Sequence, residues 1–278
     1  MRIDAALARA IEELRSHSES PRIDAELLLA RALTVARSYL FAHPEDVLDE
    51  AAVARFFDTV ERRKQGLPLA YITGEKEFWS LPLIVTPDTL VPRPETELLV
   101  ELALRHIPRR AEYRVLDLGT GSGAVALAIA SERPTCEVTA TDVSEAALGV
   151  ARENARRLQL ANVSFLQGDW TEPLAGRRFD LVVSNPPYVP HGDPALDALR
   201  HEPAIALAAG EDGLAAIRLL ARDCRALLQP GSPLLLEHGI EQRGAVASIL
   251  EAQGWSGVRC HPDLSGRPRA TVACAPAA

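Results

Sequence analysis

The residues best suited to chemistry are Ser184–Tyr188, with the sequence Ser-Asn-Pro-Pro-Tyr, after the short apolar run Phe179–Val183. That run is typical of a buried strand. Both prolines lack a backbone N–H and have a fixed φ, so the carbonyls there cannot be drawn into a helix. The Asn185 side chain adds a carbonyl oxygen, and Tyr188 adds a flat ring. Two acceptors beside a ring suit a planar –NH2 group, an amide or an aromatic amine, although a rigid turn with a buried tyrosine would have the same sequence.

A glycine-rich loop, Asp117–Gly123, lies between an expected strand at 114–118 and an expected helix at 124–133. Glycines in such a loop permit a tight turn and let a ligand approach the helix N-terminus. Asp142, at the end of the next expected strand, is placed to accept both hydroxyls of a ribose. The candidate cofactor-binding residues are Asp117, Gly119, Thr120, Gly121, Ser122, Gly123, Asp142, Trp170 and Asn185.

The glycine loop does not by itself identify the cofactor. With Ala124 it also satisfies the looser dinucleotide pattern G-x-G-x-x-G/A, which is found in nicotinamide-dependent oxidoreductases. Asp117, just before the glycines, suits a cationic amino group better than a pyrophosphate. At the end of the third expected strand, Asp169 offers a carboxylate for an adenine amino group and Trp170 an indole to cover the base. These features favour S-adenosylmethionine.

Other site chemistries do not fit the spacing of the residues. Thr120 and Ala124 stand where the pattern G-x-S-x-G needs glycine, so Ser122 is not expected to be a nucleophile. There is no P-loop, and the seven histidines show no metal-ligand spacing, so we expect no metal. The four cysteines form no C-x-x-C pair, which fits reduced thiols.

Length and charge limit the class of protein. The 278 residues, 47% of them hydrophobic, suffice for one large domain and a small one. The net charge of -8 and the absence of a Lys/Arg block disfavour binding to a phosphate backbone. The N-terminus is acidic where a signal peptide would be apolar, and no apolar run approaches membrane-spanning length. We therefore expect a soluble cytoplasmic protein without a direct nucleic-acid or membrane partner.

The pattern along the chain predicts three parts: a helical bundle at 1–70, a hairpin-like connector at 71–92 and an α/β domain at 93–278. In the bundle, Ser20 and Asp49 are expected to cap helices, with Pro21 in the first turn. After a helix at 98–106, strands and helices alternate, which predicts a doubly wound, Rossmann-like parallel sheet. The further expected strands are 137–141, 163–167, 179–183, 234–237 and a closing pair, 258–260 with 270–274; the further expected helices are 145–158, 213–228 and 240–253.

With these motifs in this order, the chain resembles the class I methyltransferases that modify planar nitrogen, and among them the HemK/PrmC family of release factor glutamine methyltransferases. One departure is Gly231-Ser232-Pro233, where the family more often has paired glycines. The matching segments are Tyr71–Gly74 with Phe78-Trp79, Pro92–Glu97, Asp117–Gly123, Asn185–Tyr188, Glu202-Pro203, Gly213-Leu214, Glu237–Gly239 with Gln242, and Asp263–Arg267.

The resemblance implies methyl transfer from S-adenosyl-L-methionine, which leaves S-adenosyl-L-homocysteine, to the glutamine of a Gly-Gly-Gln loop in translation release factors. Asn185 Oδ1 and the Pro186 carbonyl would accept the two N–H groups of the glutamine amide, with Pro187 and Tyr188 beside them. Catalysis would then be mostly positioning. The resemblance also makes the helical bundle a candidate substrate-docking domain.

Several alternatives remain at this level. An adenine amino-group methyltransferase of nucleic acid would use the same four residues but would need a basic groove. A nicotinamide-dependent oxidoreductase would bind NAD, and a non-catalytic module that binds release factors would have no need of Asn185 beside the cofactor loop. The bundle at 1–70 either docks the substrate or only buttresses the larger domain. The pattern assigns no role to Arg93, Glu95 or Glu97.

Overall fold

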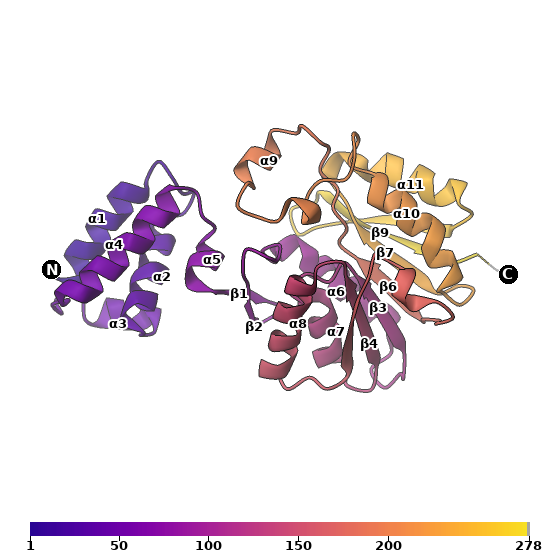
Figure 1. Ribbon diagram of the computed structural model, residues 1–278, viewed down its shortest axis with the longest axis horizontal. Helices are drawn as coiled ribbons and strands as arrows, with labels where there is room; N and C mark the ends of the chain where they lie inside the picture. Colours follow the sequence, from indigo (N-terminus) through magenta and orange to yellow (C-terminus); the bar gives the residue numbers. More distant parts are fainter. Residues whose placement is uncertain (277–278) are drawn as a thin grey trace. The chain divides into compact units, whose positions relative to one another are not determined.

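The computed structural model describes residues 1–276, and the chain divides into two compact units, Met1–Glu75 and Lys76–Ala278 (Figure 1). The first unit is helical, as its periodic apolar residues predict. Its helices are α1 (Ile3–Leu14), α2 (Pro21–Leu33), α3 (Arg37–Ala42), α4 (Glu50–Lys64) and α5 (Leu69–Thr73). Their inward faces form one core, which includes Ile3, Leu14, Leu28, Leu29, Phe56 and Val60.

The helix starts of this unit differ in how they are capped. The Asp49 carboxylate accepts the backbone N–H of Ala52 at 2.6 Å, which confirms the expected cap of α4. Ser20 directly precedes α2, but its side chain makes no capping hydrogen bond, so that part of the prediction is wrong. The short helix α3 buries only Leu40 and therefore leaves no periodic apolar stripe in the sequence.

The connector forms the expected hairpin, from β1 (Glu75–Phe78) and β2 (Leu81–Ile84). Its two turn residues, Trp79 and Ser80, have φ values of 53° and 58°. A two-residue turn with both φ positive usually contains Asn or Gly, so this one requires support from elsewhere. Glu97 supplies it, because its carboxylate accepts the backbone N–H of Trp79 at 2.8 Å.

The second unit contains the expected α/β sheet, with strand order β5-β4-β3-β6-β7-β9-β8. All neighbouring pairs from β5 to β7 are parallel, and β9 runs antiparallel to β7 and β8. The order reverses between β3 and β6, and such a switch point is where open α/β sheets bind ligands. The strands are β3 (Arg114–Leu118), β4 (Glu137–Asp142), β5 (Val163–Gln167), β6 (Leu181–Ser184), β7 (Pro233–Glu237), β8 (Ser256–Pro262) and β9 (Pro268–Cys274).

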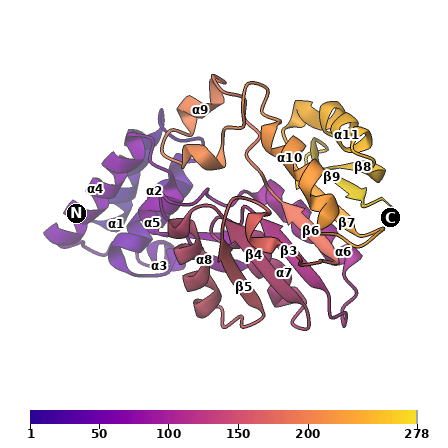
Figure 2. The same ribbon diagram turned by 45° about the vertical axis from the view of Figure 1, so that its right-hand side comes forward.

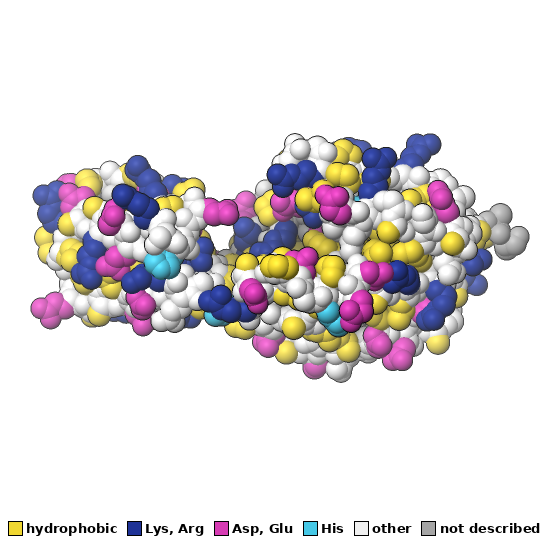
Figure 3. All heavy atoms as spheres, turned by 90° about the horizontal axis from the view of Figure 1, so that it is seen from above, with side chains coloured by type: hydrophobic (Ala, Val, Ile, Leu, Met, Phe, Trp, Pro, Cys, Tyr) yellow, Lys and Arg dark blue, Asp and Glu magenta, His cyan; other side chains and the backbone are white. Residues whose placement is uncertain are grey.

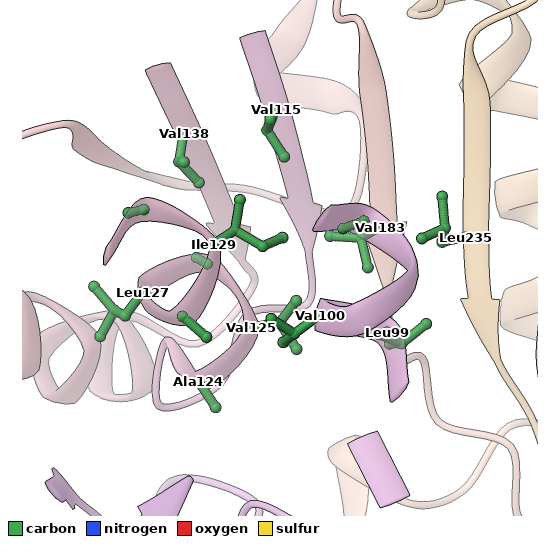
Figure 4. Packing of buried hydrophobic residues seen from close by; sticks show 14 of the residues in the cluster. Leu99, Val100, Val115, Ala124, Val125, Leu127, Ile129, Val138, Val183 and Leu235 are labelled. Atoms are coloured by element: carbon green, nitrogen blue, oxygen red, sulfur yellow. The ribbon is translucent and has the colours of Figure 1, made fainter. Parts of the chain in front are cut away.

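Helices cover both faces of this sheet (Figures 1 and 2). One face packs against α6 (Glu97–His106), α7 (Ala124–Glu132) and α8 (Glu145–Arg157), and the other against α10 (Ala215–Asp223) and α11 (Arg243–Ala252). A short helix, α9 (Ala195–Ala198), lies in the long segment after β6. Figure 4 shows how inward strand residues meet the first group of helices; it labels Val115, Val138, Val183 and Leu235 of the strands, Leu99 and Val100 of α6, and Ala124, Val125, Leu127 and Ile129 of α7.

The ends of some elements differ from the expectation. The strand expected at 179–183 begins only at Leu181, because Phe179 bonds instead to the backbone of Leu227. The helices expected at 213–228 and 240–253 each contain a separate 3-10 turn, Cys224–Ala226 and Ile240–Gln242. Within residues 1–276, none of the helices has the length and apolar character needed to cross a membrane.

Candidate functional site

A cavity of about 570 Å³ opens at the carboxyl ends of β3, β4 and β6. It lies at the reversal of strand order, where parallel strands direct their following loops to one edge of the sheet. Its walls come from residues within 88–96, 117–125, 141–147, 168–170, 185–187 and 203–219. Every sequence-predicted cofactor residue except Gly123 lines it. Gly123 is the last residue of the glycine loop and directly precedes α7.

The loop after β3 has the backbone conformation that glycine permits. Gly119, Gly121 and Gly123 have φ values of 72°, 56° and 86°. At Gly123 a Cβ would lie 3.0 Å from the side chain of Leu127 and 3.2 Å from that of Ala151. A larger residue there would be both strained and crowded, so the loop can turn directly into α7 only with glycine.

Asp117 lies under this loop and is 2% exposed. Its Oδ2 accepts the Thr120 hydroxyl at 2.6 Å and the backbone N–H of Ala126 at 3.2 Å. Burial raises the pKa of the Asp117 carboxyl to about 7, although these two hydrogen bonds act in the opposite direction. Within the described chain both bonds end on Oδ2, which leaves Oδ1 for a ligand. A cationic amino group in the cavity would compensate the buried charge.

Asp142 is held at both carboxylate oxygens. Oδ2 accepts the backbone N–H of Gly121 at 2.8 Å, and Oδ1 accepts that of Ser144 at 2.9 Å. Each oxygen keeps further acceptor capacity, and the residue lines the cavity. The carboxylate is therefore fixed in place for a pair of donors such as the two hydroxyls of a ribose.

Trp170 lies over the glycine loop. Its indole ring comes within 3.5 Å of the position that a Cβ of Gly119 would occupy, which is ordinary van der Waals contact. The backbone of Trp170 has a φ of 46°, which is unusual for a residue with a large side chain. The neighbouring Asp169 is exposed and also lines the cavity. The structure thus brings the expected carboxylate and indole to one wall of the site.

Asn154 is a site residue that sequence reasoning missed. It is fully buried in α8, and its Nδ2 donates to the carbonyls of Ser122 at 2.9 Å and Ile84 at 3.0 Å. Its Oδ1 accepts the backbone N–H of Ile84 at 2.7 Å. One side chain thereby joins the glycine loop to the hairpin. The only signal in the sequence was an amide inside an otherwise amphipathic helix.

The motif after β6 lies directly beside the glycine loop. Ser184 ends β6, and its hydroxyl donates to the carbonyl of Leu118 at 2.7 Å. Asn185 Nδ2 donates to Thr96 Oγ1 at 3.2 Å, so its Oδ1 is the end left to accept a substrate donor. Asn185 and Pro187 line the cavity, whereas Pro186 and Tyr188 are not part of its wall.

Tyr188 is fixed at both ends. Its hydroxyl donates to Glu237 Oε1 at 3.2 Å, and its carbonyl accepts Gln242 Nε2 at 2.9 Å. Burial and the charge of Glu237 raise the pKa of the Tyr188 hydroxyl well above its ordinary value. At Gly213, φ is 71° and a Cβ would lie 2.2 Å from the Tyr188 carbonyl oxygen. The sequence marked Glu237, Gln242 and Gly213 only as parts of a resemblance, without a role at the site.

The residues to which the sequence assigned no role have distinct contacts. Arg93 lines the cavity and pairs with the buried carboxylate of Glu202, whose Oε2 also accepts the backbone N–H of Val91 at 2.9 Å. The charge of Glu95 contributes to a raised pKa at Glu237. Together with the bond from Trp79 to Glu97, these contacts hold the segment ahead of α6 against the site.

The surface shown in Figure 3 has Lys and Arg side chains interspersed with Asp and Glu side chains on both units. Over the described residues in that view, no continuous basic field is visible. Binding to a nucleic-acid backbone depends on clustered positive charge. The charged side chains visible in this view are mixed in sign.

Comparison with known proteins extends over nearly the whole chain. Residues 5–74 match the family model of the PrmC N-terminal domain, and residues 95–209 match that of the methyltransferase small domain. The chain is 46% identical over 271 residues to the release factor glutamine methyltransferase of Coxiella burnetii, with 98% of each chain covered. It is 44% identical over 268 residues to the protein of the same name from Escherichia coli, with 96% of each covered.

A similarity to solved structures concerns the fold. The chain is similar to a methyltransferase from Pyrococcus furiosus with a TM-score of 0.54 and 21% identity, over 71% of this chain and 90% of that one. At this identity the similarity shows only that the two proteins share an α/β fold.

Proposed function

This chain belongs to the family of release factor glutamine methyltransferases, and we propose that it methylates the side-chain amide nitrogen of a glutamine in translation release factors. The proposed methyl donor is S-adenosylmethionine, and the proposed target is the glutamine of a Gly-Gly-Gln loop. One observation carries the proposal beyond the family: Asn185 lies on the wall of the cofactor cavity with its amide nitrogen already bonded to Thr96. Because translation takes place in the cytoplasm, the same proposal places the enzyme there.

The residues around the cavity fit the proposed cofactor in three places. Asp117, buried with Oδ1 left for a ligand, suits the cationic amino group. Asp142, fixed at both oxygens, suits the ribose hydroxyls, and Asp169 with Trp170 suits the adenine. When bound, S-adenosylmethionine would supply an electrophilic methyl group on a sulfonium.

The protein's part in the reaction would be to position a weak nucleophile. An amide nitrogen reacts poorly because its lone pair is delocalised over the carbonyl. Asn185 Oδ1 and the Pro186 carbonyl would accept its two N–H groups, and Tyr188 would pack near the amide plane. Fixing two reactants in this way can supply about 7–11 kcal/mol of a barrier. Acceptors aimed at the nitrogen would also stabilise the positive charge that develops there.

The test is methyl transfer from labelled S-adenosylmethionine to an intact release factor and to the same factor with its Gly-Gly-Gln glutamine changed to alanine. We expect label in the first and none in the second. Label in both would mean that the methylated residue is not this glutamine but another residue of the factor. Label in a nucleic acid and in neither factor would instead establish the adenine methyltransferase that uses the same four residues.

A further inference from the structure

The carboxyl group of Glu237 lies directly behind the substrate motif. In the parallel pair of β6 and β7, Ser184 is in register with Leu236, so Asn185 and Glu237 follow at the same level of two adjacent strands. Glu237 is 1% exposed and does not line the cavity. Its Oε1 accepts the Tyr188 hydroxyl, whereas Oε2 is buried without a close hydrogen-bond donor. A buried carboxyl with one oxygen unpartnered is costly to keep, and the structure should have a use for it.

Thr96 connects this carboxyl to Asn185. Its side chain is 4% exposed, at the start of α6, which packs against β6 and β7. Its Oγ1 accepts Asn185 Nδ2 at 3.2 Å, and its hydroxyl lies beside the Glu237 carboxyl and lowers the pKa of that acid. The contacts therefore run from Asn185 to Thr96, from Thr96 to Glu237, and from Glu237 to Tyr188.

The direction of these hydrogen bonds follows from the number of protons. An ionised carboxylate only accepts, so a threonine hydroxyl beside it gives its single proton to the carboxylate. The Thr96 oxygen can then only accept from Asn185, which turns the Asn185 nitrogen towards Thr96 and its oxygen towards the cavity. A neutral acid would donate to Thr96 and leave the hydroxyl proton for the Asn185 oxygen, which favours the flipped amide.

We propose that Glu237, acting through Thr96, is a positioning residue that sets which end of the Asn185 amide faces the substrate. This inference rests on the proposed function, because it concerns the group that would accept a substrate N–H. It adds a requirement that the four-residue motif does not contain: the amide must be oriented by a buried negative charge on the neighbouring strand.

The groups around Glu237 determine the pH range in which its carboxyl carries a charge. Burial raises the pKa of the Glu237 carboxyl to about 7, the Glu95 charge acts in the same direction, and Arg269 and the hydroxyls of Thr96 and Tyr188 act against them. The adjacent His238, whose own pKa is lowered by burial, bonds to Thr271 and to the Gly239 carbonyl. The carboxylate and its orienting effect are therefore expected to be lost as the pH falls through about 7.

The first test is a kinetic cycle with Thr96→Val, which keeps the shape of the side chain and removes the hydroxyl. With a release factor as substrate, kcat should fall about tenfold, whereas cofactor affinity measured by calorimetry should change much less, although Thr96 also lines the cavity. Thr96→Ser should recover most of the loss. In an Asn185→Ala background, Thr96→Val should have no further effect, because Thr96 acts through Asn185. An equal loss in both backgrounds would overturn the proposal.

The control for these variants is Thr139→Val. Thr139 is also a buried threonine of this sheet, and its hydroxyl contacts Ser164 far from the motif. This change should leave kcat as it is. If Thr96→Val does not fold, Glu237→Gln takes its place in the same cycle, since the amide keeps the volume and loses the charge.

A second test needs no substrate and so separates this inference from the proposed function. In the ¹⁵N-labelled protein, the side-chain NH2 resonances of Asn185, identified by their loss in Asn185→Ala, are followed from pH 5.5 to 8.5. They should titrate with an apparent pKa near 7, from Glu237, and this step should vanish in Glu237→Gln. Resonances that titrate identically in both proteins would show that Glu237 does not orient the amide.

Discussion

The carboxylate of Asp142 accepts the backbone N–H of Gly121 at 2.8 Å, which joins the end of β4 to the loop that follows β3. The same carboxylate accepts Ser144 N–H at its other oxygen. Both bonds fix the group at the rim of the cavity, where hydroxyl donors of a ribose would complete its coordination. The contact therefore stabilises the shape of the glycine loop, and it also holds the carboxylate in place for a ligand.

Asp142→Ala should weaken binding of S-adenosylmethionine about tenfold or more, because a hydrogen bond to a charged group contributes roughly 1.5–3 kcal/mol. Isothermal calorimetry measures this directly. Asp180→Ala is the matched control: Asp180 also accepts a backbone N–H, from Arg114, but before β6 and at the opposite end of the sheet. Equal affinities of the wild-type protein and Asp142→Ala would mean that another group holds the ribose.

Cofactor affinity should depend on pH through Asp117. In the free protein burial raises the pKa of this carboxyl to about 7, and a bound ammonium group would lower it. Binding then favours the ionised form, so the affinity should be full above pH 7 and fall by about tenfold for each pH unit below it. Calorimetry between pH 5.5 and 8.5 measures the slope.

Asp117→Asn is the control for that slope. Its affinity should be lower at pH 8 and nearly independent of pH through the same range. If the wild-type protein binds the cofactor equally well at pH 5.5 and 8, Asp117 does not pair with the amino group.

Asn185→Ala should reduce turnover far more than cofactor binding. The lost acceptor matters mainly when the amide nitrogen is aimed, so kcat should fall by about a hundredfold. Asn162→Ala is a suitable comparison, since Asn162 is a partly buried asparagine whose amide holds the carbonyls of Ala130 and Cys136, away from the cavity. Wild-type turnover in Asn185→Ala would remove this residue from the reaction.

Gly213→Ala should displace the motif through its backbone. At Gly213 a Cβ would lie 2.2 Å from the carbonyl oxygen of Tyr188, and φ is 71°. Gly231 has a similar φ of 81° with open space around it, so Gly231→Ala measures the conformational penalty alone. We expect Gly213→Ala to unfold at a clearly lower temperature than Gly231→Ala and to lose most of its activity. Similar melting temperatures for the two variants would show that the contact relaxes without cost.

The sequence predicted the part of the site that depends on local pattern. The loop Asp117–Gly123, Asp142 and Asn185 each follow a strand, and parallel strands bring such positions together at one edge. In the structure these positions lie around one cavity, at the point where the strand order reverses. The role of each residue towards a ligand stays a prediction.

The parts that the sequence did not reveal depend on distant contacts. Thr96 and Glu237 are separated by 141 positions in the numbering, and neither has a periodic or motif signal for the interaction with Asn185. Thr96 directly precedes α6, and its side chain makes no capping bond there. Buried polar partners of this kind become visible only when the packing of α6 against the sheet is known.

The N-terminal unit is predicted to select the substrate. A glutamine side chain offers the site few atoms, so selectivity for one protein must come from remote contacts, and their binding energy also positions the reacting group. Residues 5–74 match the PrmC N-terminal domain. Deletion of residues 1–75 should therefore preserve cofactor affinity and remove most of the kcat/KM towards an intact release factor.

The position of the cut follows from the structure. A cut near Pro92 would remove the hairpin, whose β2 backbone bonds to Asn154 at the glycine loop, whereas the second compact unit begins at Lys76. The shortened protein must first show a cooperative thermal transition and wild-type affinity for S-adenosylmethionine. A short Gly-Gly-Gln peptide serves as the control substrate, and both proteins should methylate it poorly. If the folded, shortened protein methylates the intact factor as well as the full chain does, residues 1–75 have no docking role.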